Sequence, residues 1–154
     1  MLRVLHAFDR EGLDYVLIGA AAMGFHGLVR ATEELEFFIR ATPEDVERLK
    51  RAFLEVYADD PSIAEIRAAD LLGDYPAVRY YPPSGDLYFD VMTRLGEFAS
   101  FETVEQETKV VDGIRVRVAT PAALYQLKKS TVRPLDRQDA EALRRRFDLQ
   151  EEPA

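Results

Sequence analysis

Hydrophobic residues recur along this chain at two spacings, and each spacing predicts a different kind of element. Apolar positions three or four residues apart predict helices at 2–10 and from 43 to about 57. Compact or alternating apolar runs, which are typical of strands, occupy 13–19, 35–39, 77–81, 87–92, 107–111 and 114–119. The pattern therefore predicts interleaved strands and helices.

Polar residues that favour helix caps mark where several helices begin. Thr42 precedes a proline and two acidic residues, so it is predicted to cap the helix that follows. Thr120, which is also followed by proline, is predicted to begin another helix, and Asp136 to cap a last one that ends near Phe147. The alanine-rich run 20–26 is expected to form a short helix between two strands.

Two hairpins are predicted from the turn residues between strands. Asp112-Gly113 joins two strands as a type I′ turn. The segment 82–86, with two prolines and a glycine, joins two others. Segment 64–72 could be helical, and 97–104 is expected to be a loop or a short helix.

Length and composition limit the class of protein. With 154 residues, 47% of them hydrophobic and 31% charged, the chain is expected to fold as a single domain over 1–154. Its lack of cysteine excludes disulfides and thiolate metal sites, and it fits a cytoplasmic protein. The longest apolar stretch, about 16–25, is too short to cross a bilayer, and no signal peptide is evident, so no membrane partner is expected.

The net charge of −8 weighs against binding to a long nucleic acid duplex, which usually requires a basic surface. The positive residues nevertheless gather toward the C-terminus, as Lys128, Lys129, Arg133, Arg137 and Arg144 to Arg146. A local basic groove therefore stays open as an alternative.

Three carboxylates carry the clearest candidate chemistry. Glu34 and Glu36 stand at alternate positions of one predicted strand, so both project from the same face. Asp90 lies within the otherwise apolar strand 87–92, where an uncompensated charge is costly. Placed on adjacent strands, the three acids would form a cradle for one or two Mg²⁺ ions, which prefer oxygen ligands. The alternative is that they are acids at a solvated strand end.

Gly19 is a second candidate, because it lies between a predicted strand and a predicted helix. A glycine turn of this kind can bring backbone N–H groups to a phosphate. Such turns are also common for packing reasons, so the glycine gains meaning only beside the carboxylates.

The run IGAAAMGFHGLVRATEELEFFI resembles the core of the minimal nucleotidyltransferases, in the branch that contains the AbiEii-type toxins and their small relatives. That core has a Gly-Gly or Gly-Ser turn, a short helix, an Asp-x-Asp pair on the next strand and a third Asp on a later strand. His-Gly, Arg and Thr often precede the pair in this branch, matched here by His26, Gly27, Arg30 and Thr32. The run YFDVMTRLGEF supplies the third acid as Asp90, and the later RPLDRQDAEAL is also similar.

The resemblance implies a nucleotidyltransferase (DNA polymerase beta-like) fold of the α/β (α+β) class, with a mixed β-sheet flanked by helices. It implies Mg²⁺-dependent transfer of a nucleoside monophosphate from an NTP to a hydroxyl on RNA, protein or a small molecule. In the toxin branch the acceptors are tRNA ends and the partner is an antitoxin. The implied catalytic and metal-binding residues are Glu34, Glu36 and Asp90, and the implied nucleotide-binding residues are Gly19, Ala20, Arg30, Thr32 and Lys128.

Two departures from the family pattern keep a second hypothesis open. Ala20 replaces the second residue of the glycine turn, and both acids of the pair are Glu. The extra methylene of Glu moves each carboxylate outward by about 1.5 Å, whereas two-metal chemistry requires ions about 3.5–4 Å apart. The chain could therefore be a non-catalytic nucleotide-binding or protein-interaction module. Arg30 could pair with a neighbouring glutamate, and His26 is expected to bond to the backbone at a helix end.

Other residues also have two interpretations. Lys128 could contact the triphosphate or could pair with Asp136. Tyr80, Tyr81 and Tyr88 could stack on a nucleobase, although strand tyrosines usually serve packing.

Overall fold

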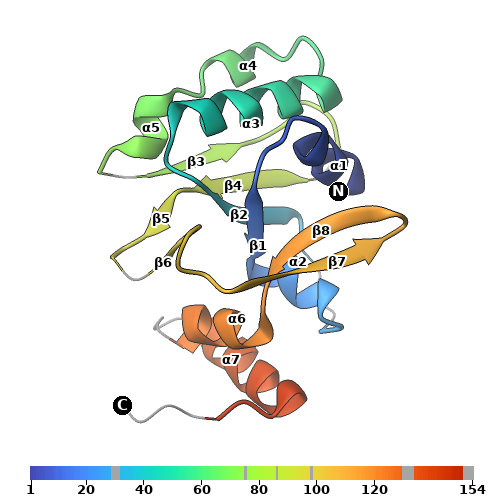
Figure 1. Ribbon diagram of the computed structural model, residues 1–154, viewed down its shortest axis with the longest axis vertical. Helices are drawn as coiled ribbons and strands as arrows, with labels where there is room; N and C mark the ends of the chain where they lie inside the picture. The colour runs from blue at the N-terminus through green and yellow to red at the C-terminus, as the bar shows by residue number, and fades with distance from the viewer. Residues whose placement is uncertain (29–31, 75, 86, 98, 130–133, 151–154) are drawn as a thin grey trace.

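Six strands form one sheet in the order β3-β4-β2-β1-β8-β7 (Figure 1). The structure is a computed structural model that describes residues 1–28, 32–74, 76–85, 87–97, 99–129 and 134–150. The strands are β1 (Tyr15–Ile18), β2 (Glu34–Ile39), β3 (Ala77–Tyr80), β4 (Tyr88–Met92), β7 (Gln106–Val111) and β8 (Ile114–Ala119). β1 runs antiparallel to β2 and parallel to β8, and β2 runs parallel to β4, so the sheet is mixed.

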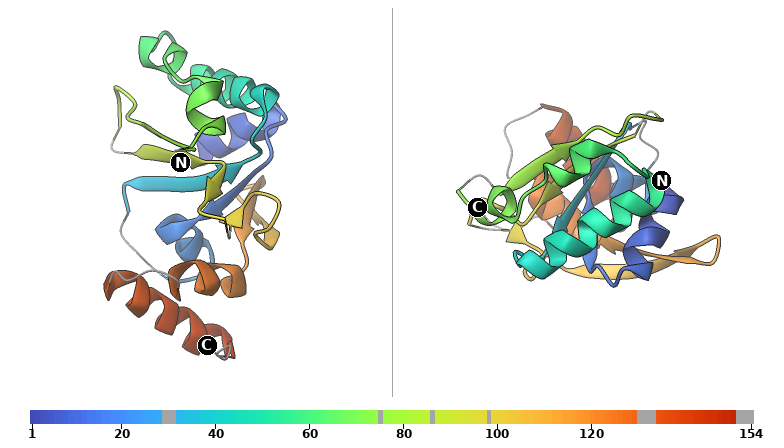
Figure 2. Two further views of the ribbon diagram at one scale, coloured as in Figure 1. Left: turned by 90° about the vertical axis from the view of Figure 1, so that its left-hand side faces the viewer. Right: turned by 90° about the horizontal axis from the view of Figure 1, so that it is seen from above.

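The helices divide between the two sides of this sheet (Figures 1 and 2). One side carries α1 (Leu2–Arg10), α3 (Pro43–Val56), α4 (Pro61–Ala64) and α5 (Ala68–Leu72). The other side carries α2 (Gly19–Phe25), α6 (Pro121–Lys129) and α7 (Pro134–Phe147). None of the described helices is both long enough and apolar enough to span a bilayer.

Aromatic side chains fill the space between the sheet and the helices α1 and α3. The ring of Phe8 lies 5.2 Å from that of Tyr15 and 5.1 Å from that of Phe37, and the rings of Phe53 and Phe89 are 5.0 Å apart. All five side chains are fully buried, and burying a phenylalanine contributes about 1.5–3 kcal/mol to folding. Because Phe37 and Phe89 face this core, their neighbours in each strand face the opposite side of the sheet.

The predicted cap at Thr42 and the predicted turn at Asp112-Gly113 are both confirmed. Thr42 caps α3, since its side-chain oxygen accepts a hydrogen bond of 3.1 Å from the backbone N–H of Asp45. The β7–β8 hairpin turns through Asp112 and Gly113, whose φ angles of 51° and 76° are both positive, as a type I′ turn requires. The segment 64–72 is largely helical, divided between the end of α4 and all of α5.

Two sequence predictions are wrong. The segment 97–104 contributes a strand, β6 (Ala99–Ser100), which pairs with β5 (Arg94–Leu95) in a separate small sheet. Strands of two residues are too short to produce an apolar pattern. Asp136 does not cap the last helix, because α7 begins two residues earlier and Asp136 lies buried in its first turn. The proline that begins α7 suits the first helical position, which the cap assignment overlooked.

Candidate functional site

The register of two parallel strands brings the candidate acids together. Glu36 in β2 stands directly opposite Asp90 in β4, and Glu34 stands opposite Tyr88. Residues two apart in a strand share a face, so all three acids project from the same face of the sheet. We call this surface, defined by Glu34, Glu36 and Asp90, the acid face.

The acid face is turned toward the layer of α2, α6 and α7. The alternating residues Leu35, Phe37 and Phe89 are fully buried, and Phe37 and Phe89 pack against rings from α1 and α3. The acids between them must therefore point to the other layer. This placement brings Glu36 near Gly19 of α2 and Lys128 of α6.

Gly19, the first residue of α2, lies directly against the carboxylate of Glu36. A side-chain carbon at Gly19 would stand 2.6 Å from Oε2 of Glu36, which is closer than non-bonded atoms approach. The φ angle of Gly19 is also positive, at 69°, a conformation that side chains rarely adopt. Glycine is thus favoured here for two independent reasons. The following residue, Ala20, is half-buried.

The three acids carry charge unequally. Burial, a hydrogen bond with Asp90 and the charge of Glu36 together raise the pKa of Glu34 to about 8. Burial also acts to raise the pKa of Asp90, but hydrogen bonds from Arg79 and Glu34 outweigh it and hold that pKa below its usual value. At neutral pH Glu34 therefore keeps its proton and donates it in a hydrogen bond to the Asp90 carboxylate.

Arg79 is the cation that balances this cluster. It stands on β3 directly opposite Asp90, and its Nε and Nη2 donate to the two oxygens of Asp90 at 3.0 and 3.1 Å. Two parallel bonds between a guanidinium and a carboxylate form one of the stronger charged contacts in proteins. Hydrogen bonds with Asp90 and then with Tyr81 raise the pKa of Arg79 above its usual value.

Carboxylate oxygens are the ligands that Mg²⁺ prefers, so the donor chemistry of the acid face suits this ion. In the described part of the chain, however, no three Asp, Glu or His side chains are placed so that they could hold a metal ion together. Asp90 instead bonds to Arg79 through both oxygens, and Glu34 bonds to Asp90. Metal binding by Glu34, Glu36 and Asp90 stays a prediction.

A small cavity of about 80 Å³ lies beside Glu36, and Lys128 from α6 is part of its wall. The lining residues are Ile18, Gly19, Glu36, Leu95, Leu124, Leu127, Lys128 and Asp136. The Nζ of Lys128 lies 3.3 Å from Asp136 and 3.0 Å from Asp139, and the side chains of all three are almost fully buried. The alternative that Lys128 pairs with Asp136 is therefore confirmed, and a contact of Lys128 with a triphosphate stays a prediction.

The other residues singled out by the sequence have local partners. The side-chain oxygen of Thr32 accepts a hydrogen bond of 3.0 Å from the backbone N–H of Glu34, which fixes the entry into β2. His26 is buried, and its Nε2 lies 2.7 Å from the carbonyl oxygen of Ala119, as expected for a helix-end histidine bonded to the backbone. Arg30 lies outside the described residues.

Sequence reasoning missed Arg79 and Asp139. Counting outward from a turn at 82–86 places residue 79 opposite residue 89, one position away from the observed partner Asp90, so hairpin arithmetic alone misses this pair. Asp139 follows Asp136 by three positions and therefore shares its helix face. Its burial beside a lysine from another helix has no local signal in the sequence.

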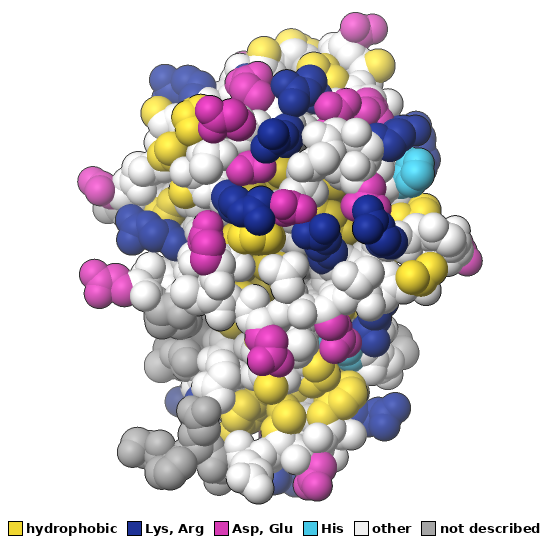
Figure 3. All heavy atoms as spheres, in the orientation of Figure 1, with side chains coloured by type: hydrophobic (Ala, Val, Ile, Leu, Met, Phe, Trp, Pro, Cys, Tyr) yellow, Lys and Arg dark blue, Asp and Glu magenta, His cyan; other side chains and the backbone are white. Residues whose placement is uncertain are grey.

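Acidic and basic side chains are interspersed on the face shown in Figure 3, most visibly over the upper half of the molecule. Opposite charges at close spacing produce only a weak field at a distance. This face therefore does not offer the continuous basic surface that a nucleic acid duplex requires.

Comparisons with known proteins agree on the fold. No protein-family model and no curated protein sequence matches this chain. Among solved structures, a Thermotoga maritima protein assigned as a nucleotidyltransferase matches with a TM-score of 0.55 and 13% identity, over 95% of this chain and 89% of that chain. An antigenic nucleotidyltransferase-like protein from Paracoccidioides brasiliensis matches with a TM-score of 0.56 and 15% identity, over 92% of this chain and 74% of that chain. The fold prediction is thus confirmed: the chain has the nucleotidyltransferase fold, a mixed sheet flanked by helices.

Proposed function

We propose that this protein binds an NTP together with Mg²⁺ at the acid face and transfers the nucleoside monophosphate to a hydroxyl group. One observation supports this more than any other: the register that sets Glu36 beside Asp90, with Glu34 on the same face. Within a nucleotidyltransferase fold, paired carboxylates on adjacent strands offer oxygen ligands to the cation that accompanies a triphosphate. The acceptor is proposed to be a hydroxyl of RNA, including tRNA ends, or of a protein.

Glu34, Glu36 and Asp90 would hold the ion, which when bound would offset the negative charge of the triphosphate oxygens. The protein supplies positioning. The close approach of Gly19 limits where the Glu36 carboxylate can lie, and Arg79 keeps Asp90 ionised until an ion replaces it at that carboxylate. The backbone around Gly19 and the side chain of Lys128 are proposed to face the phosphates across the cavity that both residues line.

Calorimetry with Mg²⁺ and each NTP, beside a labelled-NTP transfer assay, tests this proposal. Glu36→Gln keeps the size of the side chain but removes its charge, and it should abolish Mg²⁺-dependent binding. Glu47→Gln, an exposed acid of α3 in the opposite layer, is the matched control and should change nothing. An unaltered protein that shows no Mg²⁺-dependent NTP binding would overturn the proposal.

The length of the glutamate side chains can be tested separately. Replacing both Glu34 and Glu36 with Asp shortens each by one methylene. If reach alone limits the chemistry, the double variant should transfer nucleotide faster than the unaltered protein, with NTP affinity largely unchanged. A slower double variant would show that the site is built around glutamate.

The bidentate contact of Arg79 favours a second candidate function, a non-catalytic module in which the guanidinium takes the place of the cation. Arg79→Gln separates the two. In the module, this change removes the only described cation bonded to Asp90 and lowers stability without improving Mg²⁺ binding. In the enzyme, it removes a competitor and strengthens Mg²⁺ binding. Association with an antitoxin-type partner stays a prediction from the sequence resemblance.

A further inference from the structure

A pair of stacked tyrosines adjoins the acid face. The rings of Tyr81 and Tyr88 lie 5.1 Å apart at an interplanar angle of 24°. Tyr81 is 61% exposed, and among the described residues no other aromatic side chain is exposed to this degree. A large ring held in a fixed stack but left in solvent has not been placed by the need to fill a core. We call Tyr81 and Tyr88 the tyrosine pair.

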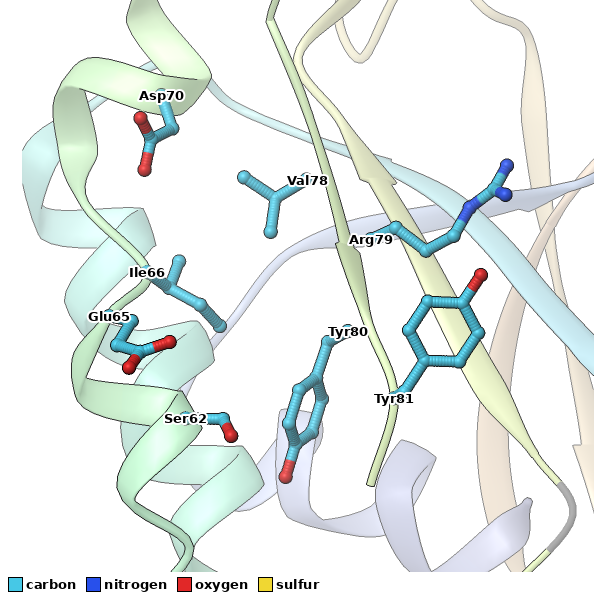
Figure 4. Close-up of a pocket in the computed structure, with 8 residues that line it drawn as sticks. All are labelled: Ser62, Glu65, Ile66, Asp70, Val78, Arg79, Tyr80 and Tyr81. Carbon is cyan, nitrogen blue, oxygen red and sulfur yellow. The ribbon is translucent and has the colours of Figure 1, made fainter. Parts of the chain in front are cut away.

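The strand register places the tyrosine pair on the same face as the acids. Tyr88 stands beside Glu34, and it is two residues from Asp90 on the same strand. Figure 4 shows Tyr81 and Arg79 projecting from the same side of β3, away from the helices that carry Ser62 and Asp70. The guanidinium carbon of Arg79 also lies 5.6 Å from the ring centre of Tyr88. The aromatic rings, the guanidinium and the carboxylates therefore form one continuous surface.

The neighbouring Tyr80 shows how a packing tyrosine behaves in this strand. It points to the other side of β3, is almost fully buried, and packs against Phe53 at 4.7 Å. Its hydroxyl donates to Asp60 at 2.5 Å. The usual explanation of strand tyrosines as core residues therefore applies to Tyr80. It does not apply to Tyr81, whose outer surface remains open.

Space is available next to the pair. A hollow of about 340 Å³ runs along the free edge of β3, between that strand and α4 and α5, and Tyr81 is one of its lining residues (Figure 4). The ring of Tyr81 projects to the opposite side of β3 from the helices that wall this hollow, so a planar group stacked on its exposed surface would meet solvent rather than packed protein. Because β3 is an edge strand, there is also room for a nucleic acid strand that continues beyond the stacked group.

We propose that the tyrosine pair binds an unpaired nucleobase by stacking, beside the acid face where the phosphates are handled. The proposal rests on the proposed function and names the group that positions its substrate. Every nucleobase has a flat π-surface that stacks on tyrosine, and a nearby guanidinium adds a further attraction. Bases within a duplex are already paired and stacked, so they are not available to the tyrosine pair. The net charge of −8 also weighs against binding of a duplex. The base could belong to the NTP or to a single-stranded acceptor end.

Calorimetry in the presence of Mg²⁺ with four probes tests the proposal: ATP, adenosine, tripolyphosphate and a single-stranded trimer of adenylate. Tyr81→Leu keeps an apolar side chain but removes the ring, and Tyr81→Phe restores the ring without the hydroxyl. Tyr81→Leu should weaken the base-bearing probes about 5- to 150-fold, the range that base–aromatic stacking supplies. Tyr81→Phe should bind like the unaltered protein, and tripolyphosphate should bind equally to all three.

The probes separate the two sources of the base and the two proposals. A loss confined to ATP and adenosine assigns the stacked base to the donor, and a loss confined to the trimer assigns it to the acceptor. If tripolyphosphate does not bind but the trimer binds through Tyr81, the proposed function fails and the base site stands. If Tyr81→Leu binds every base-bearing probe as well as Tyr81→Phe does, or if none of them binds to the unaltered protein, the base site is overturned.

Discussion

The contact between Gly19 and Glu36 allows a substitution whose effect can be worked out from the structure. Gly19→Ala places a methyl group where the Glu36 carboxylate now lies, 2.6 Å from its Oε2. It also forces an alanine into a positive φ of 69°. Gly12→Ala is a closely matched control, because Gly12 has a φ of 70° and a methyl group there would meet nothing within 4 Å. The two variants share the backbone penalty and differ only in the contact with Glu36.

The shared backbone term is about 1–2 kcal/mol, the cost of the left-handed conformation for a residue with a side chain. Oε2 is the end of a flexible side chain, so Glu36 should rotate away rather than push the backbone apart. Holding a side chain away from its preferred rotamer costs about 0.5–1.5 kcal/mol. We therefore expect Gly12→Ala to cost about 1–2 kcal/mol and Gly19→Ala about 1.5–3.5 kcal/mol.

Urea unfolding followed by circular dichroism at 25 °C measures both costs. Each substitution is then repeated in a Glu36→Ala background, where the end of the obstructing side chain is absent. There the cost of Gly19→Ala should fall to that of Gly12→Ala. Equal costs in the original background, or an excess that persists without Glu36, would refute the explanation. Gly19→Ala should also weaken Mg²⁺-dependent NTP binding, because it moves a proposed ligand, whereas Gly12→Ala should leave binding unchanged.

Two further predictions concern ion pairs that join separate elements of the fold. Lys128→Met removes the buried ammonium that bonds to both Asp136 and Asp139, so the free energy of unfolding should fall, by at most about 3–5 kcal/mol. Adding Asp136→Asn and Asp139→Asn should recover most of the loss, and no recovery would contradict the charge explanation. Asp14 bonds to Arg40 at 2.5 Å, and its pKa is lowered although burial opposes this. A carboxyl group whose pKa is lowered in the folded state stabilises the fold at pH values above its usual pKa. This stabilisation is lost as the pH falls below that value. The stability difference between Asp14→Asn and the unaltered protein should therefore shrink below about pH 4 in urea titrations, and a constant difference would contradict this.

Much of the fold could be predicted from the sequence because its strongest signals are local. The cap at Thr42 and the turn at Asp112-Gly113 act within a few residues, and both are found as predicted. The two-residue strands β5 and β6 produce no pattern, since they depend on pairing with each other rather than on alternation. The boundary at Asp136 was misplaced because an acid in the first turn and an acid at the cap look alike in sequence.

The candidate site, like the fold, could be predicted from the sequence only in part. The alternation of Glu34 and Glu36 is enough to place them on one face, and the position of Asp90 in an apolar strand marks it as unusual. What the sequence does not contain is the partner of each acid. Arg79 reaches Asp90 across a strand pair, and Asp139 reaches Lys128 between two helices. These contacts decide the charge state of the site, and they depend on tertiary packing.

The position of β1 in the sheet has a consequence for the order of folding. β1 pairs with β2 after a short connection, but it meets β8 only after about 100 residues of chain, as the hydrogen bond between Tyr15 and Arg115 illustrates. Closing a long loop costs more entropy than closing a short one, so distant pairings tend to form later. During synthesis, Gly19 and Glu36 can therefore come together well before Lys128 exists, and the last helices complete a surface that the first 40 residues have already outlined.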